Sequence, residues 1–345
     1  LSFGQDGEVS GVYGRVVGAA PNLIVGTAAA DTLTGGDNAD SLVGNAGNDM
    51  LVGGLGDDTL IGGDGVDSLV GGDGDDVYVL DSGDISATFA PLDHITDTGG
   101  IDTVQSAVTV SISTLTSIER VTLTGTAAAN ATGNTGNNLL TGNDGANSLS
   151  GGDGNDTLVG GLGTDSLVGG SGNDVYVLDS GDINATSFAS LDVIVDTGGT
   201  DTILSSATIS IATHTTIEAV TLTGADAINA TGNTGNNTLT GNSGANSLSG
   251  GNGNDTLVGG GGADTFDGGL GNDVYLLTAA DLGADGALIV NITDSGGIDT
   301  VSGAVTLDIS ALASLEGITL TGAEAINATG NAGANTLTGN SGANS

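Results

Sequence analysis

The sequence predicts an all-β fold, a β-solenoid made of short stacked repeats. Three observations predict it. Glycine accounts for 65 of the 345 residues and recurs at fixed intervals. The apolar residues are evenly spaced along the chain, and many alternate with polar residues as in strands. No segment shows the period of an amphipathic helix, and no stretch of about 18 residues is apolar enough for a transmembrane helix.

Nine-residue rows organise about half of the chain. They occupy residues 26–79, 133–177, 232–276 and 330–345, where the last row is cut short. All eighteen rows begin with Gly, sixteen have Gly at position 4, and position 6 is Asp in twelve rows and Asn in six. Position 8 is Leu in most rows and aromatic in four. We expect a glycine-rich turn over positions 1–6 and a short strand over positions 7–9, with the side chain of position 8 pointing inward.

A longer period of 98–99 residues lies over these rows, since Asp76-Val77-Tyr78-Val79-Leu80 recurs as Asp174-Val175-Tyr176-Val177-Leu178 and, with a change, at Asp273. The inserts between the runs alternate apolar and polar residues and are expected to form strands. The predicted organisation is a lead-in or cap (1–25), nonapeptide runs (26–79, 133–177, 232–276 and the start of a fourth, 330–345) and inserts (80–132, 178–231, 277–329). Because the chain begins without Met and ends inside a repeat, we expect it to be a piece of a longer polypeptide.

The charge restricts the partners of the chain. It has 42 acidic residues and two basic ones, Arg15 and Arg120, for a formal net charge of −40. Nucleic acid and anionic membrane surfaces are therefore excluded as partners, because both require a basic face. Divalent cations are favoured. Cysteine is absent, so the chain contains neither a disulfide nor a thiolate metal site.

Two rows would make one coil, so the position-6 carboxylates of alternate rows would stack about 4.8 Å apart. Such neighbours repel by roughly 1 kcal/mol in water and by several times more near a protein surface. Calcium binds carboxylate and carbonyl oxygens, and an ion between coils would turn the repulsion into a cross-link. The predicted calcium ligands are Asp31, Asp40, Asp49, Asp58, Asp67, Asp76, Asp156, Asp165, Asp174, Asp255, Asp264 and Asp273.

The rows Gly53-Gly54-Leu55-Gly56-Asp57-Asp58 and Gly151-Gly152-Asp153-Gly154-Asn155-Asp156 resemble the G-G-x-G-x-D-x-U-x repeat of the RTX calcium-binding family, found in large secreted or surface proteins of bacteria. The resemblance implies a right-handed parallel β-roll with calcium between turns, bound by the position-6 Asp and by turn carbonyls. It covers about half of the chain directly. The inserts, which read IERVTLTG, IEAVTLTG and LEGITLTG at their ends, are similar to segments between repeat arrays of that family.

Some positions depart from the pattern or are less certain. Six rows have Asn at position 6, and we expect their coils to bind calcium weakly or not at all, because Asn offers a neutral oxygen and can form side-chain ladders. These residues are Asn138, Asn147, Asn237, Asn246, Asn335 and Asn344. The turns DTGGID, DTGGTD and DSGGID are either weaker calcium sites or plain turns; their carboxylates are Asp97, Asp102, Asp196, Asp201, Asp294 and Asp299. The recurring Glu119, Glu218 and Glu316 are expected at the surface.

No constellation for catalysis is visible, since His94 and His214 do not recur at matching positions and no nucleophile motif is present, so we do not expect an enzyme. We expect a calcium-dependent structural protein of the bacterial exterior that folds after type I secretion: a segment of an S-layer, a filament or an adhesin spacer that self-associates into a lattice, filament or polymer. The alternative is the secretion and folding region of an exported enzyme whose catalytic domain lies outside this chain. A calcium-buffering protein is a third, weaker reading.

Overall fold

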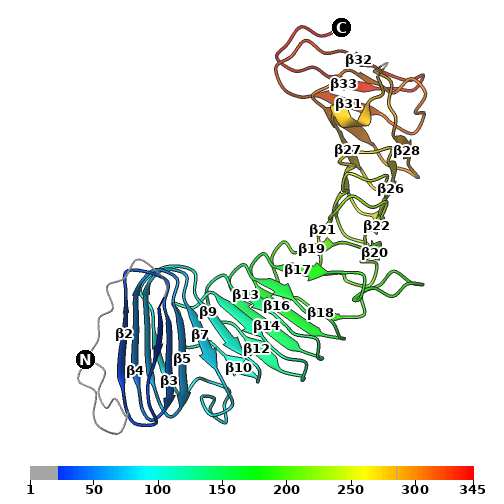
Figure 1. The fold of residues 1–345 in the computed structure, drawn as a ribbon. Helices are drawn as coiled ribbons and strands as arrows, with labels where there is room; N and C mark the ends of the chain where they lie inside the picture. The colour runs from blue at the N-terminus through cyan, green and yellow to red at the C-terminus, as the bar shows by residue number, and fades with distance from the viewer. Residues whose placement is uncertain (1–21, 285) are drawn as a thin grey trace. The chain divides into compact units, whose positions relative to one another are not determined.

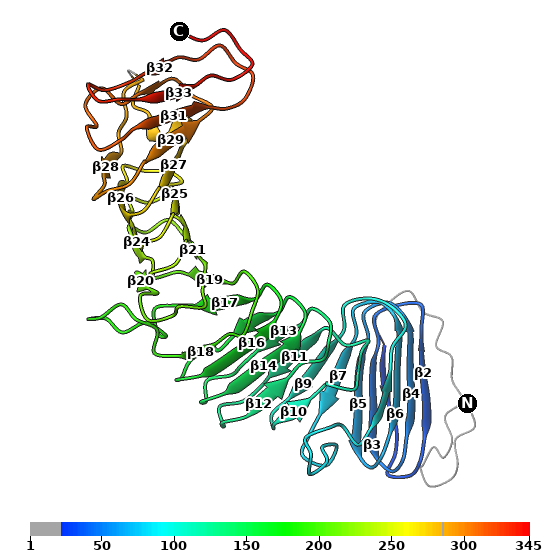
Figure 2. The same cartoon turned by 180° about the vertical axis from the view of Figure 1, so that it is seen from behind.

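The computed structural model describes residues 22–284 and 286–345, which form two compact units (Figure 1). Of the described residues, the first unit comprises 22–174 together with 193–197, and the second comprises 175–192, 198–284 and 286–345. Both units are all-β, as predicted, and consist of short parallel strands stacked as the rungs of a solenoid (Figures 1 and 2). The expected cap falls mostly on residues 1–21, which lie outside the described residues.

The strands of the first unit are short and follow one another at regular intervals. They are β1 (Leu23–Val25), β2 (Thr32–Gly36), β3 (Ser41–Ala46), β4 (Met50–Leu55), β5 (Thr59–Asp64), β6 (Ser68–Asp73), β7 (Val77–Leu80), β8 (His94–Thr96), β9 (Thr103–Ser106), β10 (Val110–Ser111), β11 (Arg120–Leu123), β12 (Asn130–Thr132), β13 (Leu139–Thr141), β14 (Ser148–Asp153), β15 (Thr157–Val159), β16 (Ser166–Ser171) and β18 (Val193–Val195).

The second unit repeats this pattern and adds one short 3₁₀ helix, η1 (Ala279–Asp281). Its strands are β17 (Val175–Leu178), β19 (Thr202–Ser205), β20 (Ile209–Ser210), β21 (Ala219–Leu222), β22 (Ala230–Thr231), β23 (Thr238–Thr240), β24 (Ser247–Asn252), β25 (Thr256–Val258), β26 (Thr265–Leu270), β27 (Val274–Leu277), β28 (Asn291–Thr293), β29 (Thr300–Gly303), β30 (Leu307–Asp308), β31 (Gly317–Leu320), β32 (Ala328–Thr329) and β33 (Thr336–Thr338). Over the described residues, no helix is long and apolar enough to span a membrane.

Alternate strands pair in parallel, so two rows make one coil. β3 pairs with β5 with Leu42 opposite Leu60, and β4 pairs with β6 with Leu51 opposite Leu69. Each partner lies 18 residues further along the chain, which is twice the nonapeptide period. Figure 2 shows β2, β4 and β6 side by side in one sheet of the first unit. The nonapeptide period therefore fixes the register of the coils.

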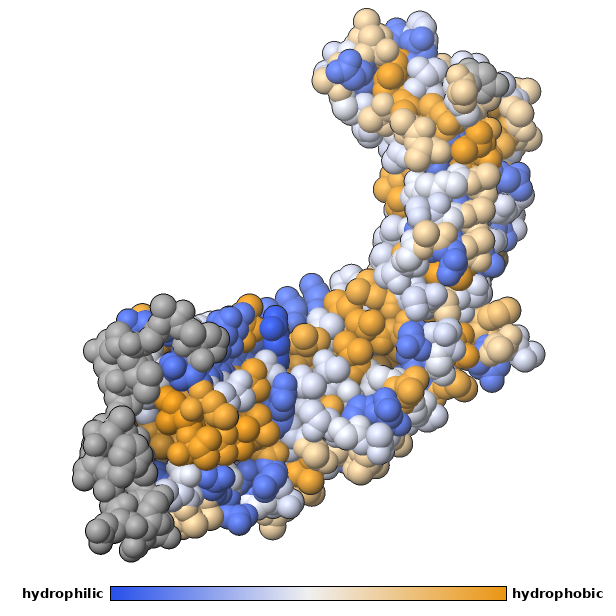
Figure 3. All heavy atoms as spheres, in the orientation of Figure 1, coloured by the Kyte–Doolittle hydropathy of each residue, from blue (hydrophilic) through white to orange (hydrophobic). Residues whose placement is uncertain are grey.

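The core of each unit is a thin column of inward side chains. The position-8 residues of the first three runs, such as Leu33, Leu42 and Tyr78, have no solvent exposure, whereas Leu337 in the fourth run is 49% exposed. Burying each leucine contributes about 1.5–3 kcal/mol, and each packs on the same position of the next coil. Outward residues stay partly exposed, and Figure 3 shows apolar residues gathered over the first rungs, where Leu23 and Val25 are 71% and 50% exposed.

Two features differ from the sequence-based expectation. In several rows the strand does not stop at position 9 but continues through the first two glycines of the next row, as β4 does from Met50 to Leu55, whereas β13 and β15 end at position 9. Glycine is required there because Gly54 has φ of 123° and Gly56 has φ of 99°, conformations that other residues resist. The inserts also coil: β9 pairs with β7 and with β11, so the rungs continue through residues 80–132.

Candidate metal centre

Position 6 places one buried carboxylate of each coil directly beside the backbone of the coil before it. The backbone N–H of Asp58, for example, donates to Oδ1 of Asp76 at 2.7 Å. These aspartates are 5% exposed or less. The same bond joins Asp31 to Asp49, Asp40 to Asp58, Asp49 to Asp67, Asn138 to Asp156, Asn147 to Asp165, Asp156 to Asp174, Asn237 to Asp255, Asn246 to Asp264 and Asp255 to Asp273. The columns predicted from the sequence are therefore present.

In many of these carboxylates the second oxygen is buried and has no hydrogen-bond partner among the described residues. Among residues 22–284 and 286–345, Oδ2 is buried without a hydrogen-bond partner in Asp40, Asp49, Asp58, Asp67, Asp76, Asp156, Asp255, Asp264 and Asp273. A buried polar atom left unpaired costs about 1–3 kcal/mol, and more when it carries charge. A repeated cost of this kind indicates that another group, a proton or a cation, completes each site.

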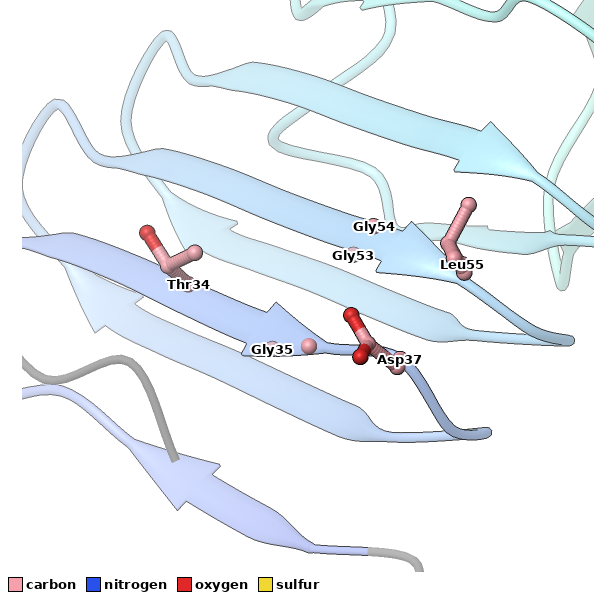
Figure 4. A pocket seen from close by; sticks show the side chains of 7 residues that line it. Thr34, Gly35, Asp37, Gly53, Gly54 and Leu55 are labelled. Atoms are coloured by element: carbon pink, nitrogen blue, oxygen red, sulfur yellow. The ribbon is translucent and has the colours of Figure 1, made fainter. Parts of the chain in front are cut away.

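Glycine carbonyls lie beside the unpaired oxygens. A side chain at Gly53 would collide with Oδ2 of Asp58 and would come within 2.7 Å of the carbonyl oxygen of Gly71, one coil further on. A shallow hollow, lined in part by Gly35, Gly53 and Gly54, runs over neighbouring rungs because these residues have no side chains (Figure 4). The atoms that could bind a metal ion here are carboxylate and carbonyl oxygens. Calcium prefers these ligands, so the residues present fit this ion.

The electrostatics favour a positive partner in the same places. Burial is the main cause that raises the pKa of Asp58 to about 6 and those of Asp76 and Asp156 to about 7. Neighbouring carboxylates raise these pKa values further, while the backbone N–H bond to each carboxylate opposes the shift. Metal-free carboxylates at these positions are thus costly to ionise, and a bound cation would remove that cost.

In the asparagine rows, the position-6 side chain is satisfied by hydrogen bonds instead of a cation or a proton. Nδ2 of Asn147 donates to the carbonyl oxygen of Ala129 at 2.6 Å and to Oδ1 of Asn143 at 3.1 Å. Nδ2 of Asn143 donates in turn to the carbonyl oxygens of Thr124 and Ala127, both at 2.9 Å. Amide hydrogens therefore satisfy carbonyls of the preceding coil. Asn at position 2 takes part in this hydrogen-bond network. The sequence contains a sign of this pairing, because every row with Asn at position 6 also has Asn at position 2.

Aspartates of the acidic turns and the recurring glutamates belong to the same columns as the position-6 aspartates. Asp76 N donates to Oδ1 of Asp102 at 2.8 Å, and Asp102 N donates to Oε2 of Glu119 at 2.9 Å. Glu119 is half-buried and occupies the place of a position-6 aspartate rather than an open surface. Glu218 and Glu316 accept the equivalent bonds from Asp201 and Asp299. Asp97 and Asp294 lie within 4.8 Å of their neighbouring carboxylates, and Asp196 and Asp201 are buried.

Sequence reasoning missed several buried aspartates of the inserts. Asp93 accepts from Asp67 N through Oδ1 at 2.9 Å, and its Oδ2 has no hydrogen-bond partner in the described part of the chain. Burial is the main cause that raises the pKa of Asp93 to about 7 and that of Asp84 to about 6. Asp182, Asp192 and Asp281 are buried in the same way in the later inserts. Their recurrence at 98–99 residues was a visible signal, but no nonapeptide motif surrounds them.

The comparisons with known proteins agree with this geometry. The family described as RTX calcium-binding nonapeptide repeat (4 copies) matches residues 17–51, 52–84, 132–167, 151–182, 231–266, 240–275 and 327–345, which together cover more than half of the chain. No curated protein matches the chain. The matches contain all twelve aspartates predicted as calcium ligands and leave most of each insert uncovered. The chain therefore belongs to the family of RTX calcium-binding nonapeptide repeats, and calcium is its cofactor.

Proposed function

We propose that this chain is a calcium-dependent structural protein of the bacterial exterior, in which ions bound between coils hold the solenoid together. One observation carries the proposal: the columns of buried carboxylate oxygens that find no donor in the described protein. The ions would be held by Oδ2 of the position-6 aspartates and by the carbonyls of the position-1 glycines. Calcium supplies positive charge and oxygen coordination at these places, and no reacting group is needed.

The energy of such binding is large enough to decide whether the chain folds. Extracellular modules bind calcium with dissociation constants of about 10⁻⁴–10⁻³ M. A free concentration tenfold above that value stabilises the folded state by roughly 1.4 kcal/mol per site. About ten sites would contribute on the order of 14 kcal/mol, which is comparable to the stability of a whole domain. The chain would thus stay largely unfolded in calcium-poor cytosol and fold after export by a type I pathway.

A spacer, filament or surface lattice is the structural role that these units support best. Each coil contacts only its neighbours, so units add length without changing the fold. Nonapeptide rows recur in each of the three repeats of about 99 residues, although the number of rows and the residue at position 6 differ between the repeats. Self-association of such units would form the polymer.

Two measurements test this function. Circular dichroism of the purified chain should show strand content that falls on chelation and is restored by calcium; strand content indifferent to chelation would refute the proposal. Electron microscopy of the calcium-loaded protein should show ordered sheets or fibres. Dispersed particles would instead favour the alternative, a secretion and folding region of an exported enzyme.

A further inference from the structure

The first nonapeptide run meets its insert at a cluster of three carboxylates. One oxygen from each of Asp76, Asp97 and Asp102 lies within 4.8 Å of the other two. Asp76 and Asp102 are 0% and 1% exposed. Regular coils bring only position-6 carboxylates together, so this cluster carries more negative charge than any pair of neighbours in the regular columns.

A tyrosine hydroxyl holds one member of the cluster in place. Oη of Tyr78 donates to Oδ1 of Asp97 at 2.8 Å and accepts from the backbone N–H of Gly71 at 2.9 Å. A side chain at Gly71 would collide with Oδ2 of Asp76 and with Oη of Tyr78, and would come within 2.5 Å of Oδ1 of Asp97. Three oxygens therefore converge on one glycine. Most nonapeptide rows have Leu at position 8, where Tyr78 lies in its row, so they lack this hydroxyl.

Few basic side chains are available to neutralise this cluster. Oδ2 of Asp76 is buried and has no hydrogen-bond partner within residues 22–284 and 286–345. Arg15 and Arg120 are the only basic residues of the whole sequence, against 42 acidic ones. A buried, unpaired carboxylate oxygen aimed at two further carboxylates is a strong ligand for a hard cation.

The second unit contains the same arrangement. One oxygen each of Asp273, Asp294 and Asp299 lies within 4.8 Å of the others, and Oη of Tyr275 donates to Oδ1 of Asp294 at 3.0 Å. The backbone N–H of Gly268 donates to Oη of Tyr275 at 3.1 Å, as Gly71 does to Tyr78. Within the described chain, Oδ2 of Asp273 and Oδ2 of Asp299 have no hydrogen-bond partner. Two separate units thus build the same constellation.

We propose that these two clusters are cation sites of their own, where a run meets its insert, and that they bind calcium more tightly than the sites between regular coils. Calcium affinity rises with the number of charged ligands and with the rigidity of the site, and both are greater here. Tyr78 and Tyr275 are positioning residues that hold Asp97 and Asp294. The inference rests on the proposed function, because the ion is the same.

Terbium luminescence tests the order of filling in the native chain. Tb³⁺ binds the same oxygen ligands as calcium, and it emits when a nearby tyrosine is excited. The chain has four tyrosines and no tryptophan, so this emission reports ions next to tyrosine. We expect the emission to saturate with the first ions added and calcium to displace it last. Emission that grows only after the strand signal in circular dichroism is complete would overturn the proposal.

Paired variants test the ligands. The double variant Asp97→Asn with Asp294→Asn should lose most of the early emission, because each of the two clusters loses a carboxylate. The matched control, Asp57→Asn with Asp153→Asn, changes the same charge at exposed positions and should keep the emission. Circular dichroism in excess calcium checks that both variants fold.

The outcomes separate this inference from the proposed function. Unchanged early emission in the double variant, with calcium still folding the chain, overturns the inference alone. Calorimetry that detects no calcium binding to the native chain overturns the proposed function itself. If the double variant does not fold, the native titration decides. Tyr78→Phe with Tyr275→Phe keeps both rings in the core, and calorimetry should then show weaker binding of the first calcium ions while the Tm in excess calcium stays unchanged.

Discussion

Aspartate coils and asparagine coils share one backbone but satisfy position 6 in opposite ways. In the aspartate coils of residues 26–79, Oδ1 of Asp58 accepts a backbone N–H, while its Oδ2 has no hydrogen-bond partner among the described residues. In the asparagine coils of residues 133–150, Nδ2 of Asn147 donates to a carbonyl of the preceding coil. The contrast teaches that the solenoid register does not itself require an ion. We propose a cation for the unpaired oxygen of the carboxylate, and the amide of asparagine makes hydrogen bonds in its place.

Removing calcium should produce the largest difference between the two kinds of coil. We expect the amides of residues 31–79 to lose their protection from hydrogen exchange in a chelator, because the ions that offset charge repulsion are gone. Amides near Asn143 and Asn147 should keep more of theirs, since their side-chain bonds need no metal. Hydrogen-exchange mass spectrometry with and without chelator measures both regions in one sample. Equal loss in both regions would contradict the comparison.

Filling the space beside an unpaired oxygen should have the next largest effect. A methyl group in Gly250→Ala would collide with Oδ2 of Asp255 and lie 2.7 Å from the carbonyl oxygen of Gly268. We expect a loss of about 2–3 kcal/mol in the free energy of unfolding in calcium, together with weaker calcium binding. Gly261→Ala is the control in the same run, because its nearest neighbour would be 3.6 Å away. Equal losses in the two variants would show that the site geometry is not the cause.

Turning an asparagine coil into an aspartate coil should have a smaller effect that calcium reverses in part. Asn147→Asp removes the donor to Ala129 and adds a buried charge, so we expect a loss of about 1–3 kcal/mol without calcium. Calcium should restore part of that loss by binding the new carboxylate. Denaturant unfolding at two calcium levels measures the change. Asn155→Asp, at an exposed position where the side chain acts as an acceptor for Asn173 N, should be nearly neutral at both levels.

The fold could be predicted from the sequence because the nine-residue repeat of the sequence is also the repeat of the strands. Glycine at position 1 and Leu at position 8 fix the two-row coil, and the pairing of Leu42 with Leu60 confirms it. The twelve columnar aspartates followed from the same spacing. Their assignment as calcium ligands remains a prediction, supported by the unpaired oxygens.

What the sequence could not supply was the geometry of the inserts. Their coils vary in length, since Asp67 meets Asp93 after 26 residues rather than 18. A spacing argument therefore could not bring Asp93 to the column. It also could not show that Glu119 takes the place of an aspartate there, because Asp102 and Glu119 are 17 residues apart rather than 18.

Acid should stabilise the metal-free aspartate coils, and this is the smallest effect we predict. Burial raises the pKa of Asp58 to about 6 and that of Asp76 to about 7 in the folded chain, above the ordinary aspartate value of 3.8. A carboxyl group whose pKa is higher in the folded than in the unfolded chain destabilises the folded state when it is ionised. This destabilisation disappears as the pH falls through the pKa of the folded state. Metal-depleted protein should therefore have a higher Tm at pH 5 than at pH 8.

The sign of this pH effect separates protons from calcium at one site. With calcium present, acid should lower the Tm instead, because protons then compete with the ion for the same oxygens. Asp58→Asn removes one titrating group, so its metal-free Tm should change less between the two pH values than that of the native chain. A metal-free Tm that falls with acid in the native chain would mean that these carboxylates are stabilised as anions by the protein alone, and the need for a cation between coils would vanish.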